Sequence, residues 1–333
     1  MSDFSRDAAL LALGARADGL TREGYGRAVD RGELFVAHVV RGAIHALAPG
    51  DHAVYGRALI ARDDGELGAQ LGRQVRRLAA EKGFAPGDAL DEVAEATGAA
   101  LARGRRLDKD ELHEELRARV SPELMPWCRS CGSHHVAPML WRYATVRAGV
   151  RLDSERRYQR GKPGRTPAAR EAVRRFLAYY GPAEPGDFAE WAGIAKSHAR
   201  RLWDEVAGEL IEVAVGDRQA WLLEDDAGAL ESPPAAEGVR LLPPGDPYLQ
   251  KPNRRLLAPG AELRKRLFRP VASPGAVLSD GRLCGLWRMK LTRGRAELAI
   301  ERIGRPPRRR ELDDEAERVA ALRGAAGATV AYA

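Results

Sequence analysis

Cysteine is scarce in this chain, and its scarcity limits where the protein can work. Three cysteines in 333 residues cannot form the disulfide framework of a secreted domain, so we expect a reducing compartment. No apolar run approaches the roughly 18 residues that a membrane helix needs. The N-terminus places Asp3, Arg6 and Asp7 before a short apolar run, which is not the pattern of a signal peptide. These features predict a cytoplasmic protein without membrane contacts.

Two common catalytic patterns are also missing. The segment GKPGRT (161–166) lacks the spacing of a phosphate-binding loop and follows a basic stretch where that loop would follow an apolar strand. No convincing Ser/His/Asp triad can be selected from the sequence. We therefore expect no small-molecule cofactor.

What the chain does have is an excess of positive charge. The formal net charge is +7 and the isoelectric point is about 9.5, which is in the range of nucleic-acid-binding proteins. The alternative is a basic protein with no nucleic-acid role, in which arginine content reflects codon bias. A hydrophobic fraction of 44% with 30% charged residues indicates a soluble, folded protein of more than one domain.

One stretch carries a recognisable supersecondary pattern. Residues 187–223 predict a short helix, a break at Gly193, a second helix to about Leu210, and two strands joined by Gly216-Asp217. A helix–turn–helix followed by a hairpin is the winged-helix arrangement, whose second helix normally enters a DNA major groove. The polar side chains on that helix, and therefore the candidate DNA contacts, are Lys196, His198, Arg200 and Arg201. The alternative is that this module serves only as scaffold.

The whole chain predicts an α+β protein of several modules, with a β-rich unit at the C-terminus. The expected modules are 1–65, which could be truncated at its start, 66–165, 166–228 and 238–333. Helices are expected at 6–17, 66–82, 88–103, 109–119, 167–180 and 187–192, with Asp88, Asp108 and Asp187 as caps. Asp280-Gly281 predicts a hairpin, 224–237 a linker, and the C-terminal sequence a final helix.

A basic run ends the second module. Residues 151–175 include nine Arg and Lys residues but only three Asp and Glu residues. Such a run suits contacts with the DNA backbone, which are sequence-independent, although a solvated linker would have the same composition. The candidate contacts are Arg156, Arg157, Arg160, Lys162 and Arg165.

A pair of cysteines lies beside two histidines in the same module. Cys128-x-x-Cys131 has the spacing of a zinc knuckle, and His134 is the candidate third ligand. A closed site needs four ligands, and no second pair of this kind exists in the sequence. The alternative is a turn in which Ser133 caps the next helix and both histidines face solvent or DNA.

Several motifs, spread in order over nearly the whole chain, resemble one family. They are VVRGAIHAL with Arg41, Gly42 and His45; YGPAEPGDFAEWAGI; LLPPGDPYL with Asp246, Pro247 and Tyr248; and VLSDGRLCGLWR with Asp280, Gly281, Gly285, Trp287 and Arg288. Together they resemble the AlkZ-like winged-helix family, which includes the bacterial DNA glycosylases AlkZ and YcaQ. The resemblance implies tandem winged-helix domains arranged around a DNA-binding concavity.

The resemblance implies an enzyme that excises alkylated or crosslinked purines from double-stranded DNA as a monomer, without a metal or cofactor. In the characterised enzymes a Gln-x-Gln or Gln-x-Asp motif positions the attacking water, and it is not found in this chain. Its second position falls at or near Ser2 and its first before Met1, so either the true start lies upstream or this member has lost the motif. Only Asp3 remains near the matching position, so Asp3 is the single catalytic candidate. The alternative is a non-catalytic DNA-binding protein, regulatory or lesion-binding, on the same scaffold.

Three further residues have alternative roles. Arg41 suits a phosphate contact because a guanidinium matches that geometry, but it could be a plain surface arginine. His45 could contact phosphate or lie in the core. Trp287 could stack on a base, although a strand tryptophan is more often buried, and Arg288 beside it is a further candidate DNA contact.

Overall fold

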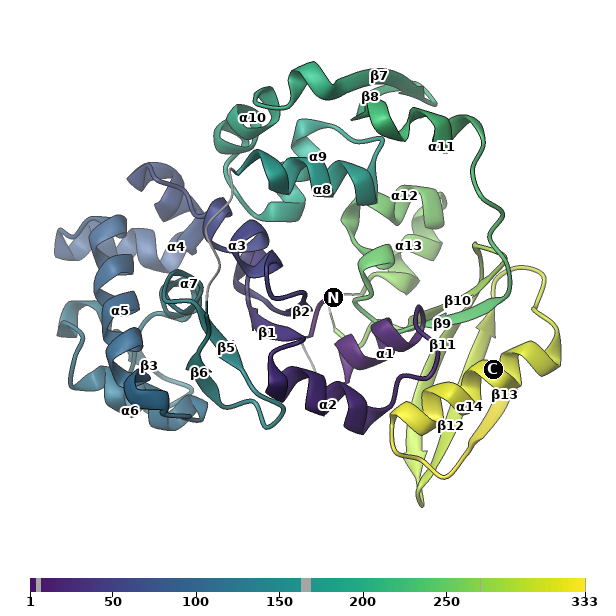
Figure 1. Ribbon diagram of the computed structural model, residues 1–333, viewed down its shortest axis with the longest axis horizontal. Coiled ribbons are helices and arrows are strands. Elements are labelled where there is room, and N and C mark those ends of the chain that lie inside the picture. Colours follow the sequence, from purple (N-terminus) through teal and green to yellow (C-terminus); the bar gives the residue numbers. More distant parts are fainter. Residues whose placement is uncertain (4–6, 163–168, 270, 333) are drawn as a thin grey trace. The chain divides into compact units, whose positions relative to one another are not determined.

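The computed structural model describes residues 1–3, 7–162, 169–269 and 271–332 (Figure 1). The chain forms two compact units. The first consists of residues 1–27 and 225–333, and the second of residues 28–224. Helix α2 (Arg22–Arg31) contains one boundary, and the 3-10 turn η6 (Glu224–Asp226) contains the other. The expected module 1–65 spans the boundary between these two units, and the boundaries of the four expected modules stay a prediction.

The first unit is built on an antiparallel sheet with one parallel edge strand. The strand order is β13-β12-β11-β10-β9. Its elements are α1 (Ala8–Gly14), α11 (Ala227–Glu231), β9 (Val239–Leu242), η7 (Pro247–Leu249), η8 (Lys251–Asn253), α12 (Arg254–Leu257), α13 (Ala261–Leu267), β10 (Gly275–Ser279), β11 (Arg282–Thr292), β12 (Arg295–Arg302), α14 (Arg309–Leu322) and β13 (Ala328–Tyr332). The expected hairpin at Asp280-Gly281 joins β10 to β11, and the expected final helix is α14.

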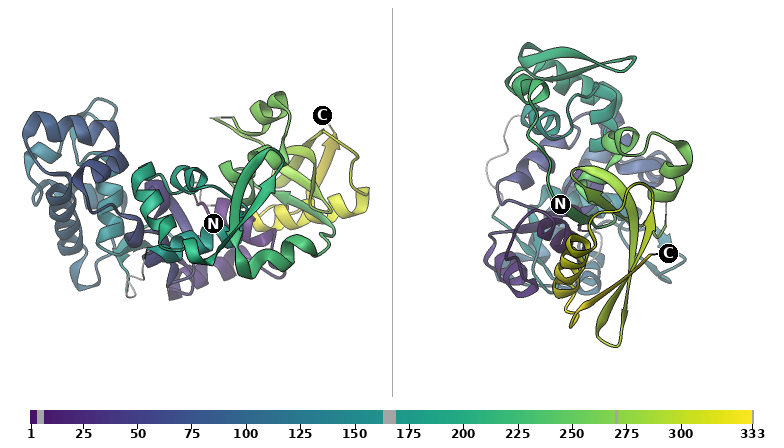
Figure 2. Two further views of the ribbon diagram at one scale, coloured as in Figure 1. Left: turned by 90° about the horizontal axis from the view of Figure 1, so that it is seen from above. Right: turned by 90° about the vertical axis from the view of Figure 1, so that its right-hand side faces the viewer.

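Helices cover both faces of this sheet. On one face, apolar residues of α1 and α14 such as Leu10 and Leu312 pack against Leu241 and Ile300 of the strands. Figure 2 shows α14 lying along this face of the sheet. On the other face, Leu267 of α13 packs against the sheet. The N-terminal helix is therefore part of the β-rich unit, far from it in sequence.

The second unit contains a four-stranded sheet and two hairpins. The sheet has the order β2-β1-β5-β6. The elements are β1 (Phe35–His38), η1 (Val40–Gly42), β2 (Ile44–Leu47), α3 (Asp51–Tyr55), η2 (Arg57–Leu59), α4 (Asp64–Lys82), α5 (Pro86–Ala100), η3 (Ala102–Gly104), α6 (Lys109–Arg117), η4 (Pro122–Leu124), β3 (Trp127–Cys128), β4 (Ser133–His134), α7 (Pro138–Arg147), β5 (Val150–Leu152), β6 (Tyr158–Arg160), α8 (Arg170–Tyr180), α9 (Pro185–Ala192), α10 (Lys196–Asp204), η5 (Ala207–Glu209), β7 (Leu210–Val215) and β8 (Arg218–Leu223). The sheet joins the expected first and second modules, because β1 pairs with β5.

The expected helix–turn–helix and hairpin are present at α9, α10, β7 and β8. The core of this part is aromatic, with Phe176, Phe188 and Trp203 buried. Gly193 ends α9 in the left-handed conformation at φ 69°, which a residue with a side chain adopts only under strain. Gly216-Asp217 is the turn between the strands of the expected wing, because Val215 pairs with Arg218.

Some local expectations are wrong, each for an identifiable reason. Helix α5 begins at Pro86, and its N-cap is Ala85, three residues before the expected cap Asp88, because proline suits the first turn of a helix. Asp187 lies inside the first turn of α9, where its side chain accepts from the Glu184 amide in a capping box. The expected linker 224–237 contains α11. Asp108, by contrast, caps α6 as expected.

Within the described ranges, no helix is both long and apolar enough to cross a membrane.

Candidate DNA-binding surface, catalytic residue and metal cluster

The second helix of the helix–turn–helix, α10, has one buried and one exposed face. Ala199, Leu202 and Trp203 are buried. His198 is also buried, at 8% exposed, and desolvation lowers its pKa. The structure thus places His198, an expected DNA contact, on the core side of the helix. Lys196 at the helix start is exposed.

The exposed arginines of α10 already have acidic partners. Arg201 binds Glu66 of α4 with both terminal guanidinium nitrogens, Nη2 donating to Oε2 at 2.5 Å and Nη1 to Oε1 at 2.8 Å. Ser197 donates to the same Glu66 oxygen at 2.6 Å. Arg200 pairs one turn along its own helix with Asp204 at 3.0 Å. Arg201 would have to leave Glu66 to reach DNA, which favours a scaffold role for this part of the helix.

Arg41 and His45 belong to the VVRGAIHAL motif, and Arg41 contacts the YGPAEPGDFAEWAGI motif. Arg41 has φ 57° and donates from Nη1 to the carbonyl oxygen of Trp191 at the end of α9. A side chain at Gly193 would clash with Arg41, because a Cβ there would lie 2.6 Å from Arg41 Cγ. His45 is half-buried with Nδ1 2.9 Å from the Ala43 carbonyl oxygen, and desolvation lowers its pKa to about 3. The imidazole is therefore neutral, and a charge-based phosphate contact by His45 is not favoured.

The basic hairpin β5–β6 is organised by one buried carboxylate. Asp153 accepts the backbone N–H groups of Glu155 and Arg157 at 3.0 and 2.9 Å, which closes the turn around Arg156 at φ 68°. Arg157 pairs with Glu111 of α6 at 2.8 Å.

Beyond this turn the hairpin carries exposed cations. Arg160 at the end of β6 and Lys162 after it are both exposed, as phosphate contacts require. Arg165 lies outside the described residues.

Asp3 is a buried residue at the start of the first unit. Only 2% of it is exposed, and its Oδ1 accepts the backbone N–H of Ala9 in the first turn of α1 at 3.2 Å. The carboxylate thus lies at the N-terminal end of α1 and accepts one of the backbone N–H groups of its first turn.

A cavity of about 540 Å³ opens beside the same helix. Ala8 and Leu11 of α1 line it together with Trp287, Arg288 and Arg323. Trp287 is 4% exposed and its indole N–H donates to the Leu242 carbonyl oxygen at 2.8 Å, which makes it a core residue. Arg288 is exposed and donates to the Ala272 carbonyl oxygen at 2.7 Å. The volume is within the range of small-molecule and base pockets.

One important contact in this unit was not expected from the sequence. The side chain of Asp246 in the LLPPGD motif is fully buried. Both of its carboxylate oxygens accept hydrogen bonds from the guanidinium of Arg16, just after α1, at 2.7 and 2.8 Å. It also caps η7 through the Tyr248 amide. Asp246 therefore fixes α1, and with it Asp3, on the sheet. The signal in the sequence was a single carboxylate, Asp246, among the mainly apolar residues of LLPPGDPYL.

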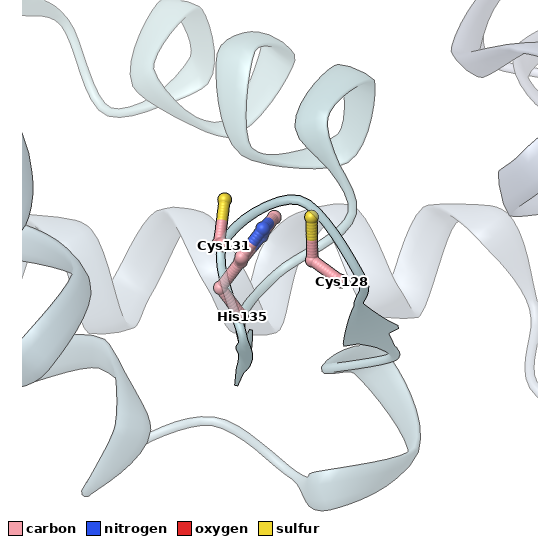
Figure 3. A group of neighbouring side chains, drawn as sticks. All are labelled: Cys128, Cys131 and His135. Atoms are coloured by element: carbon pink, nitrogen blue, oxygen red, sulfur yellow. The ribbon is translucent and has the colours of Figure 1, made fainter.

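The cysteine–histidine motif forms a cluster in the β3–β4 hairpin. One ligand atom from each of Cys128, Cys131 and His135 lies within 4.8 Å of the other two (Figure 3). The prediction of His134 as the third ligand is wrong: His135 takes that place. His134 is not in the cluster, and its Nδ1 lies 2.9 Å from the Met125 carbonyl oxygen. Ser133 lies in β4 and does not cap α7, whose N-cap is Ala137. The hydrogen bond with Ser130 is the largest of the causes that lower the pKa of Cys128 to about 6.

These features define a class of protein: a mixed α+β chain with a helix–turn–helix, β-hairpins and exposed cations such as Arg160, Lys162 and Lys196, a combination found in nucleic-acid-binding domains. Comparison with known proteins gives the family. The model of the DNA glycosylase AlkZ-like family matches residues 4–322, and the chain belongs to that family.

A curated relative and a solved structure agree with this assignment. The chain is 29% identical over 284 residues to the interstrand DNA cross-link repair glycosylase of Streptomyces sahachiroi, covering 80% of this chain and 73% of that protein. The solved structure of S. sahachiroi DNA glycosylase AlkZ has a TM-score of 0.77 at 23% identity, over 100% of this chain and 91% of that one. The expected family and the expected α+β fold are confirmed.

Proposed function

We propose that this protein binds double-stranded DNA and hydrolyses the N-glycosidic bond of alkylated or crosslinked purines. The observation that carries the proposal is membership of the DNA glycosylase AlkZ-like family over residues 4–322, nearly the whole chain. The relative from S. sahachiroi is named for interstrand cross-link repair, which supports bulky or crosslinked lesions as substrates. The exposed Arg160, Lys162 and Lys196 are the first candidates for phosphate contacts.

The chemistry demands little of the protein. Alkylation at a ring nitrogen makes the purine cationic and so a good leaving group. The protein must hold the duplex, place a water and stabilise the positive charge that develops on the sugar. A carboxylate can do the last two, by accepting a proton from water and by opposing the charge. Asp3 is the candidate for this role in a chain without the usual glutamine motif.

A second candidate function is lesion binding or regulation without catalysis. The specific observation in its favour is that no glutamine in this sequence is followed two positions later by Gln or Asp. In this alternative the scaffold grips DNA and the base stays attached.

The two functions are separated by one experiment. Duplex DNA treated with a methylating agent is incubated with the purified 333-residue chain, and free N7-methylguanine is measured by mass spectrometry, with duplex binding measured in parallel. Base release above the spontaneous rate establishes the glycosylase. Retained binding without release establishes the second candidate, and a chain that neither binds nor releases contradicts both. Solution mass, measured on the same sample, tests the expected monomer.

A further inference from the structure

The cysteine–histidine cluster of the second unit is not used by the proposed function. Cys128 ends β3, and Cys131 lies in the turn that leads to β4. The Gly132 amide donates to the Cys128 carbonyl oxygen at 2.9 Å, and Gly132 adopts φ 61°, so the chain turns back immediately after the second cysteine. This turn brings both thiols to one side of the hairpin, where His135 also lies (Figure 3).

The spacing of the ligand atoms is close to what a zinc ion needs. Bond lengths of about 2.3 Å to sulfur and 2.0–2.1 Å to nitrogen place tetrahedral ligands about 3.5–3.8 Å apart. Here all three ligand atoms lie within 4.8 Å of one another. Contraction by about 1 Å would complete the geometry. Cys131 is exposed and Cys128 and His135 are half-buried, so side-chain rotation can supply this change without altering a packed core.

The hydrogen bond of His135 selects a tautomer that leaves Nε2 available to a metal ion. Its Nδ1 is 2.8 Å from the Val136 carbonyl oxygen. Because a carbonyl can only accept, Nδ1 carries the hydrogen, and the lone pair is left on Nε2. A metal-binding histidine commonly donates its other ring nitrogen to a carbonyl in this way. The His113 ring packs edge-on against His135 with centroids 5.4 Å apart, which limits its rotation.

The neighbouring histidine provides an internal contrast. His134 lies in β4, opposite Trp127, and its ring packs against that indole with centroids 5.2 Å apart. Its Nδ1 is bound to the Met125 carbonyl oxygen outside the cluster. Two adjacent residues of one type therefore differ in their surroundings, and only His135 joins the cysteines.

We propose that Cys128, Cys131 and His135 bind one Zn²⁺ ion, with water in the fourth position. Among the residues that the structure describes, no fourth Cys, His, Asp or Glu joins the cluster, and its solvent-exposed side is open to water. Two thiolates and an imidazole favour zinc over the hard cations Mg²⁺ and Ca²⁺. The ion closes the β3–β4 hairpin and stabilises it, and this role is independent of base release.

The test measures zinc on the full chain. Tag-free protein is stripped with a chelator under phosphine reductant, given one equivalent of zinc sulfate, desalted and analysed for zinc. We expect close to one zinc per chain for wild type and below about 0.2 for C128S, C131S and H135A. The matched control, H134A, is expected to keep close to one, because His134 is outside the cluster. Circular dichroism confirms that each variant is folded.

Cobalt supplies a second readout that does not depend on the variants. Co²⁺ added to the stripped wild type is expected to give the intense visible bands of a tetrahedral site and a near-ultraviolet thiolate charge-transfer band. The proposal is overturned if wild type retains less than about 0.2 zinc. Loss of zinc in H134A equal to that in H135A also overturns it. So does a Cys128–Cys131 disulfide that resists the phosphine reductant and excludes the metal.

Discussion

Asp3 combines burial, a helix terminus and a negative charge at one residue. Asn in its place keeps an oxygen for the Ala9 amide and removes the charge. We expect the free energy of unfolding of D3N to lie within about 0.5 kcal/mol of the wild-type value. For D3A we expect a decrease of about 1 kcal/mol, because a helix-capping acceptor is lost. Under the proposed function D3N releases methylated base at least about tenfold more slowly, because the developing sugar cation loses its counter-charge.

Urea denaturation and base-release assays check this prediction side by side. D3A is the control for the structural contribution of the side chain. If D3N matches wild type in base release, the carboxylate serves only the fold, and the catalytic role is wrong.

The three cysteines are expected to differ in reactivity. In metal-free protein the pKa of Cys128 is about 6, lowered first by the Ser130 hydrogen bond, so its thiolate predominates above that pH. The pKa of Cys284 is raised by burial. We expect a fast alkylation phase by iodoacetamide whose rate rises with pH through about 6 and then levels off, because the thiolate is the nucleophile.

Peptide mapping by mass spectrometry assigns that fast phase. C128S should abolish it, whereas C284S should leave it unchanged. A fast phase that survives in C128S would place the activated thiol elsewhere.

At the scale of elements, Glu66 connects the starts of two helices. Its side chain is 13% exposed and its partner's is 58% exposed, and the hydrogen bond from Arg201, then that from Ser197, lowers its pKa to about 2. The stability that this ion pair contributes is fully present above pH 4.5, the ordinary pKa of a glutamate. It is lost as the pH falls through the folded-state pKa of about 2. We therefore expect E66Q to lower the melting temperature at pH 7, and this difference to shrink between pH 4.5 and pH 2.

Thermal unfolding of wild type and E66Q at several pH values measures the effect. E33Q is the matched control, because Glu33 pairs with Arg31 only two residues away and joins no second element. A difference between wild type and E66Q that stays constant down to pH 2 would show that the carboxylate charge is not what couples α4 to α10.

The sequence predicted elements where a signal was local. The Asp280-Gly281 turn, the capping box at Asp108 and the glycine that ends α9 each specify backbone geometry within a few residues, and all are present. The start of α5 was missed although Pro86 at its first turn was a usable signal.

Other features depend on pairings that no local pattern encodes. The Arg16–Asp246 ion pair joins residues 230 apart, and with it the N-terminal helix to the C-terminal sheet. Both histidine rings bind a backbone carbonyl, but only His135 lies close to the two thiols. A motif can therefore nominate a metal cluster, while the strand register decides its members.

At the scale of the whole molecule, the proposed duplex binding is an electrostatic property and should depend on salt. Each phosphate contact contributes about 0.9 to the slope of log K against log salt concentration. We expect the double variant R160Q/K162Q to bind duplex DNA more weakly and to reduce that slope by about 1–2, because both side chains are exposed and cationic. Fluorescence anisotropy over a salt series measures both quantities. The control R308Q/R310Q removes the same charge outside the predicted contact set and should leave the slope within about 0.5 of wild type. Equal effects from the two variants would mean that net charge, and not a defined surface on the β5–β6 hairpin, governs the interaction with DNA.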